Sequence, residues 1–275
     1  MQDVPTPRGA GNPWLDNGPG YGEMDPDTLL HQLMTVQTRD LDLSAIKHAA
    51  RPAGAATALV FSKDGKTLTS GGRDKTIRLW DPAGRKVRHE IAVDMWQIES
   101  LAFSPNERLL VAVGGGGYTG SIMLFDAATR KEVAAVPDLK EAVNCAAFSP
   151  DGSLLATGHK GGQVTVWAVG GKGLKKVVEL KEGREGMNAF AGPVAFIQGG
   201  RTLVIGGGKS IFDGSLQFVD IKTSAIRETT RLPMGVESIA VSGDGKAMAV
   251  GTSTGIDRKR VVDTPGRLMI GAVNP

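Results

Sequence analysis

The sequence predicts an all-β fold in which one strand-rich unit is repeated five times. First strands recur at spacings of 42, 45, 48 and 45 residues, anchored at Phe61, Phe103, Phe148, Phe196 and Val241. Dipeptides that accept positive φ follow four of these strands, as hairpins require: Asp64-Gly65, Asp151-Gly152, Gly199-Gly200 and Asp244-Gly245. The 38 glycines also suit a chain with many turns. A unit of this period cannot bury its own apolar face, so it must stack against copies of itself.

The segment before the repeats has a different composition. Residues 1–25 are rich in proline and glycine, which predicts a disordered head. Asp25 and Pro26 then suit the N-cap and first position of a short amphipathic helix, with an apolar stripe at Leu29, Leu30, Leu33 and Met34. This helix either packs on the rim of the array or docks a partner. Residues 1–50 are thus predicted to be an N-terminal extension and residues 51–275 the repeat domain.

Each copy is predicted to hold three or four strands, and the fifth copy holds three. The predicted ranges are 57–62, 67–71, 76–80 and 86–91; 98–104, 109–113, 121–125 and 131–136; 143–149, 153–157, 163–168 and 174–180; 193–197, 202–206, 214–219 and 225–230; and 236–241, 246–250 and 266–272.

Two copies carry a longer motif. Phe61-Ser62-Lys63-Asp64-Gly65 followed by Ser70-Gly71-Gly72-Arg73-Asp74-Lys75-Thr76-Ile77-Arg78-Leu79-Trp80-Asp81 resembles a nearly full WD-repeat signature, and Phe148–Gly152 through Trp167 resembles a second. The resemblance covers residues 55–275 and weakens where Phe125-Asp126, Phe218-Val219-Asp220 and Ile270-Gly271 stand at the Trp-Asp position. It implies a WD40-repeat β-propeller of about five four-stranded blades, used as an interaction platform and not as an enzyme.

The family's structural tetrad joins a His, a Ser or Thr, an Asp and the Trp of one blade. The resemblance assigns Ser70, Asp74 and Trp80 to it in copy one, where the Gly-His dipeptide is missing. In copy three it assigns Thr157 and Trp167, with Gly161 at the Asp position.

Closure of the ring has two predicted solutions. Residues 40–48 alternate in hydropathy, so they are able to pair beside residues 268–272 as the outer strand of the last blade and cover its edge. The alternative is an incomplete ring that a partner chain completes.

Loop lengths predict the binding face. Loops after first and third strands are short, whereas Gly114–Gly120, Gly207–Asp213, Gly251–Pro265 and the link Lys181–Gly192 are long. These long loops share one face, called here the long-loop face, and insertions on one face often mark the binding face of a repeat protein. Its candidate partner-binding residues are Trp96, Tyr118, Arg184, Lys209, Phe212, Arg258, Lys259 and Arg260. The alternatives are that Trp96 and Phe212 pack between blades and that Arg258–Arg260 is a solvated charge run.

No catalytic, cofactor-binding or metal site is predicted. The four histidines lack metal-ligand spacing, and Cys145, the only cysteine, is expected to be a small buried hydrophobe. A net charge of +3 is too weak to favour nucleic acid, although Arg258–Arg260 keeps that as the least favoured hypothesis. No apolar run of 18 residues occurs, so we expect no membrane partner and a cytoplasmic location. A protein or peptide partner is the first hypothesis; a regulatory or sensing module associated with an enzyme in the same assembly is the alternative.

Overall fold

The computed structural model of the chain describes residues 55–171, 173–181, 190–210, 213–253, 255–257, 262–264 and 268–273. The predicted disordered head, the helix after Asp25 and the closing strand at residues 40–48 lie outside these ranges. So do Arg184, Phe212 and Arg258–Arg260.

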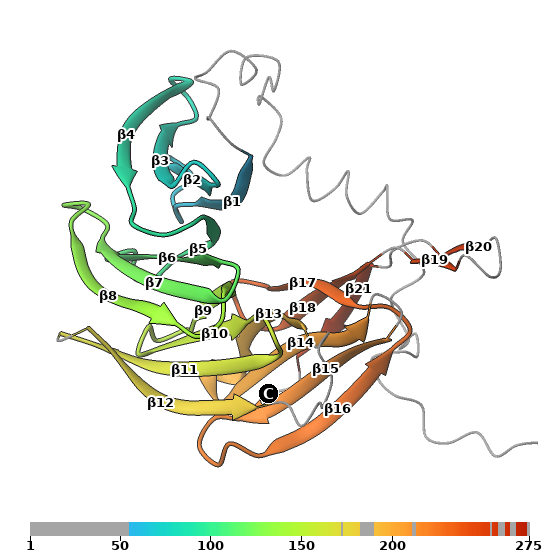
Figure 1. Cartoon of the computed structure of the whole chain (residues 1–275). Coiled ribbons are helices and arrows are strands. Elements are labelled where there is room, and N and C mark those ends of the chain that lie inside the picture. Colours follow the sequence, from blue (N-terminus) through green and yellow to red (C-terminus); the bar gives the residue numbers. More distant parts are fainter. Residues whose placement is uncertain are drawn as a thin grey trace, which may run out of the picture.

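The described chain is all-β, as predicted, and forms five antiparallel blades in chain order (Figure 1). Blade one holds β1 (Ala56–Phe61), β2 (Leu68–Gly72), β3 (Thr76–Asp81) and β4 (Lys86–Ala92). Blade two holds β5 (Ile98–Phe103), β6 (Leu109–Gly116), β7 (Thr119–Asp126) and β8 (Glu132–Leu139). Blade three holds β9 (Val143–Phe148), β10 (Leu154–His159), β11 (Gln163–Gly170) and β12 (Gly173–Lys181).

Blade four holds β13 (Phe190–Ile197), β14 (Thr202–Ser210), β15 (Asp213–Asp220) and β16 (Ile226–Leu232), with a 3-10 turn, η1, at Gln198–Gly200. Blade five holds β17 (Val236–Val241), β18 (Ala247–Thr252) and β21 (Leu268–Ala272). Between β18 and β21 the chain makes a separate hairpin of β19 (Gly255–Asp257) and β20 (Val262–Thr264). Every strand predicted within the five copies is therefore present, and blade five has three strands in the described part of the chain.

The structure corrects the prediction of long loops in copies two and four. The β6–β7 ladder continues to the pair Gly116–Thr119, and the β14–β15 ladder continues to the pair Ser210–Asp213. Glycine keeps its backbone donor and acceptor, so a glycine run can extend an antiparallel ladder when the partner strand also extends. What looked like loop insertions are longer hairpins that project beyond the blade.

The core is divided into four apolar clusters, one between each pair of consecutive blades. Each inner blade buries both of its faces, because side chains along a strand alternate between them. We call the face toward the preceding blade the front face and the other the back face. Between blades one and two, Ile77 and Leu79 on the back face of blade one meet Leu101 and Phe125 on the front face of blade two.

The five blades form an open arc. The innermost strands contact one another in the order β1, β5, β9, β13 and β17, and β17 makes no comparable contact with β1 among the described residues. In Figure 1, blade one (blue) and blade five (red) accordingly stand at the two ends of the series. Among the described residues, blade one thus has no blade before its front face, and blade five has none after its back face.

Candidate functional site

Exposed aromatic side chains gather on the long-loop face of blades one and two. Trp96, in the link from β4 to β5, is 69% exposed, and Tyr118, in the turn from β6 to β7, is 89% exposed. Lys75, in the turn from β2 to β3, places its ammonium 5.7 Å from the centroid of the Trp96 ring, which is within cation–π range. We call Lys75, Trp96 and Tyr118 the aromatic patch.

Gly116 holds the aromatic patch together. A Cβ built on Gly116 would lie 2.3 Å from Cγ of Trp96, so the indole rests directly on the backbone of the β6–β7 hairpin. Only a residue without a side chain allows this approach. The same hairpin carries Tyr118 in its turn, two residues after the glycine that the Trp96 indole contacts.

Of the eight predicted contact residues, the structure brings two, Trp96 and Tyr118, into one patch. Trp96 contacts Lys75 of blade one and Gly116 of blade two but remains 69% exposed, so it is not buried between the blades. Lys209 lies near the end of β14 at the long-loop face, and the remaining five lie outside the described residues. Lys75 was missed in the sequence, and its positive φ of 59° next to Asp74 is a feature that only the folded turn reveals.

In blade one, Nε1 of Trp80 donates a hydrogen bond of 2.8 Å to Oγ of Ser70. The Asp74 carboxylate instead accepts a hydrogen bond of 2.5 Å from Arg78, which also donates to Glu90 at 2.7 Å. The sequence placed Asp74 with Ser70 and Trp80, whereas its described hydrogen bond goes to Arg78, because the arginine brings a charge-assisted donor.

Blade three builds a longer network. Nε1 of Trp167 donates to Oγ1 of Thr157 at 2.9 Å, and that oxygen lies 3.0 Å from Nε2 of His159. The backbone of Glu141 hydrogen-bonds to the same imidazole, and burial lowers the pKa of His159 to about 4. The ring is therefore neutral at pH 7. The sequence analysis did not predict that His159 joins this network, because the family's tetrad places its histidine elsewhere in the repeat. The signal in the sequence was the position of His159, two residues after Thr157.

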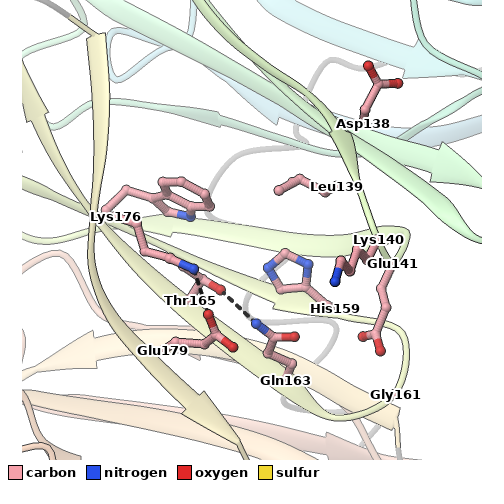
Figure 2. A pocket seen from close by; sticks show the side chains of 11 residues that line it. Asp138, Leu139, Lys140, Glu141, His159, Gly161, Gln163, Thr165, Lys176 and Glu179 are labelled. Carbon is pink, nitrogen blue, oxygen red and sulfur yellow. Dashed lines mark hydrogen bonds and ion pairs between the residues drawn. The ribbon is translucent and has the colours of Figure 1, made fainter.

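A cleft of about 600 Å³ opens between blades two and three beside this network. Its lining comes from the end of β8 and the residues just after it, from the β10–β11 hairpin and from β12: Asp138–Glu141, His159, Gly161, Gln163, Thr165, Trp167, Lys176 and Glu179 (Figure 2). Nζ of Lys176 lies 2.7 Å from Oε2 of Glu179, and Nε2 of Gln163 donates to Oγ1 of Thr165 at 3.5 Å. The cleft is thus polar and internally paired along its blade-three wall.

Reactive groups are few in the described ranges. No set of three or more His, Cys, Asp or Glu residues could hold a metal ion there. Cys145 donates a hydrogen bond from Sγ to the carbonyl of Gly192 at 3.2 Å, and burial raises the pKa of its thiol to about 11. The thiol therefore stays protonated at neutral pH and is a poor nucleophile. None of the helical residues in the described segments forms a span that could cross a bilayer.

Comparison with known proteins agrees with this architecture. The profile of the family "WD40: WD domain, G-beta repeat" matches residues 48–81 and 136–168. The Cps50 (Swd1) β-propeller domain of Myceliophteria thermophila superimposes with a TM-score of 0.63 at 20% identity, covering 74% of this chain and 64% of that one.

Two curated relatives match blades of this chain. A "Protein LST8 homolog" of Drosophila pseudoobscura pseudoobscura is 27% identical over 41% of this chain and 35% of the relative. The "Small ribosomal subunit protein RACK1" of Schizosaccharomyces pombe is 32% identical over 42% of this chain and 38% of the relative. The match thus spans less than half the length of either relative. These matches show that the chain carries WD40 repeats at residues 48–81 and 136–168 and is similar to WD40-repeat β-propeller proteins in sequence and fold.

Proposed function

We propose that this chain is a non-enzymatic interaction scaffold, and that a protein or peptide partner binds to its long-loop face at the aromatic patch. The observation that carries the proposal is the exposure of Trp96, which packs on the β6–β7 hairpin at Gly116, together with that of Tyr118 at the turn of the same hairpin. Trp and Tyr are the residue types most enriched at interface hot spots, because they bury large areas with few rotatable bonds.

The patch suits recognition because it is held in place before a partner arrives. Gly116 fixes the depth of the Trp96 indole, and Lys75 covers one face of the ring from the neighbouring blade. A preformed surface loses little side-chain entropy on binding. By its name the RACK1 relative is a component of the small ribosomal subunit, which supports an assembly role here as well. A cytoplasmic location belongs to the same proposal.

Quantitative affinity capture of the tagged full chain tests the proposal. We expect Trp96→Ala and Tyr118→Ala each to weaken capture of a specific protein by at least about tenfold, the typical cost of a hot-spot truncation. Ile226→Ala is the matched control, since Ile226 is also an exposed large apolar residue but lies on outer strand β16. Loss of the partner through substitutions on the short-turn face alone would overturn the proposal.

Gly116→Ala is a second probe that keeps both aromatic residues. The new methyl group must displace the Trp96 indole, because their atoms cannot approach within 3 Å. We expect the same partner to be weakened with little change in thermal stability. Unchanged capture by this variant would mean that the position of the indole is irrelevant to binding.

A further inference from the structure

The two ends of the arc expose apolar side chains at positions that are buried or partly buried at the internal interfaces. On the front face of blade one, Leu59 is 66% exposed and Phe61 is 48% exposed. The equivalent residues of blade two, Leu101 and Phe103, pack against the back face of blade one, where Leu101 retains 7% exposure. The β1–β2 and β5–β6 registers place these pairs at the same positions, next to Leu68 and Leu110 respectively.

Blade five shows the same exposure on its other side. Ile270 pairs with Ala249 on the back face and is 53% exposed. The residues at this position in the other blades are buried: Leu79, Leu124, Val166 and Phe218. Within the described part of the chain, both ends of the arc are therefore blade faces of the ordinary kind that lack a neighbouring blade.

The side chains on the two uncovered faces also have complementary sizes. At the first three internal interfaces, a phenylalanine such as Phe103 or Phe196 on a front face meets small or branched residues such as Val60 or Ala147 on the preceding back face. Blade one offers Leu59 and Phe61 on its free front face. The free back face of blade five offers Ala240 and Ala249 beside Ile270. The front face of one chain thus matches the back face of another by the pattern that holds at these three interfaces.

We propose that the free front face of blade one packs on the free back face of blade five of a second copy of this chain. This is a head-to-tail contact, which uses two different surfaces on each copy. Two copies would bring ten blades together, more than the 4–8 usual in closed propellers, so the contact is expected to propagate into an open series of copies. The contact leaves the aromatic patch free, because the patch lies on the long-loop face and not on a blade face.

Sedimentation velocity on the purified full chain and on two charge variants tests this contact. We expect wild type to associate more with rising concentration. Leu59→Lys removes the front surface, and Ile270→Lys removes the back surface, so each variant alone should be monomeric at all concentrations. Both side chains are half or more exposed, so both variants should fold with thermal midpoints close to that of wild type.

Mixing the two variants gives the decisive result. The Leu59→Lys chain keeps an intact back face and the Ile270→Lys chain keeps an intact front face, so an equal mixture should form a dimer and nothing larger. Val177→Lys, at a 55% exposed apolar position on β12, is the matched control and should associate as wild type does. A monomeric wild type, association of either single variant like wild type, or a mixture that stays monomeric would each overturn the proposal.

Discussion

Blades one and three share a motif but not an environment. In both, an indole N–H donates to a hydroxyl on the adjacent strand, at 2.8 Å from Trp80 to Ser70 and at 2.9 Å from Trp167 to Thr157. Trp167 is buried against blade two, whereas Trp80 lies on the free front face of blade one and is half-buried. The difference teaches that the repeat motif builds the local hydrogen bond, while the neighbouring blade decides how much that bond contributes to stability.

Truncation of the two tryptophans should show the largest difference. Trp167→Ala should lower the free energy of unfolding by about 3–5 kcal/mol, because it leaves a cavity between two blades. Trp80→Ala should lower it by about half as much, since water already reaches part of that indole. Urea unfolding followed by circular dichroism measures both, with Val177→Ala as an exposed control. Equal losses in the two blades would contradict the comparison.

His159 of blade three should make stability depend on pH in mildly acidic solution. Burial lowers the pKa of His159 from 6.5 to about 4, so between these values the unfolded chain binds a proton that the folded chain does not. The contribution of the neutral ring is fully present above pH 6.5 and is lost as the pH falls toward 4, an effect on the order of 3 kcal/mol.

His159→Gln is the matched variant for that titration. Its stability should fall less steeply than that of wild type between pH 6.5 and 4.5, as measured by thermal midpoints across the range. The turn carboxylates, such as Asp151, have lowered pKa values through their serine and backbone hydrogen bonds, so they lose stability below pH 3.8 in both proteins. Parallel profiles in the upper range would show that His159 does not titrate on unfolding.

Removal of the hydroxyl that accepts the indole hydrogen bond should have a smaller effect than truncation of the tryptophan. The loss of stability should again be larger in blade three than in blade one. Thr157→Val leaves Nε1 of Trp167 and Nε2 of His159 without this partner inside the protein and should cost about 1–3 kcal/mol. Ser70→Ala leaves only the half-buried Trp80 donor and should cost about 1 kcal/mol or less. Thr157→Ser should restore most of the loss, and failure of this rescue would point to packing instead of hydrogen bonding.

Serine substitutions in the turn after the first strand should show the smallest difference in stability between blades one and three. Oγ of Ser149 is buried, donates a hydrogen bond to Asp151 at 2.5 Å and accepts one from the Leu154 amide at 2.9 Å. In blade one, Oγ of Ser62 donates to Asp64 at 2.7 Å and accepts from the Thr67 amide at 2.9 Å, but Ser62 is less buried. Ser149→Ala should therefore lower the free energy of unfolding by about 1 kcal/mol, and Ser62→Ala by less. Differential scanning calorimetry of both variants checks the order, and a reversed order would contradict it.

Prediction from the sequence succeeded where the signal is local. Hairpin dipeptides such as Asp64-Gly65 and Asp151-Gly152 adopt the positive φ that their glycines allow, at 68° and 74°, so the strand positions followed from short stretches of chain. The length of the β6–β7 hairpin was not predictable in this way, because Gly114–Gly117 is compatible with either a loop or a ladder. Only the pairing partner, Thr119–Ser121, decided between them.

By itself, the sequence determined the repeat, the all-β class and the residues that alternate between blade faces, because these depend on period and turn chemistry along the chain. The tertiary structure alone decided which faces are covered, which tryptophan is buried and that His159 stays neutral. These properties depend on a neighbouring blade that lies about one repeat away in sequence but in direct contact in space. Leu59 and Leu101 occupy the same place in their repeats, yet one faces solvent and the other a core, because only blade two has a blade in front of it.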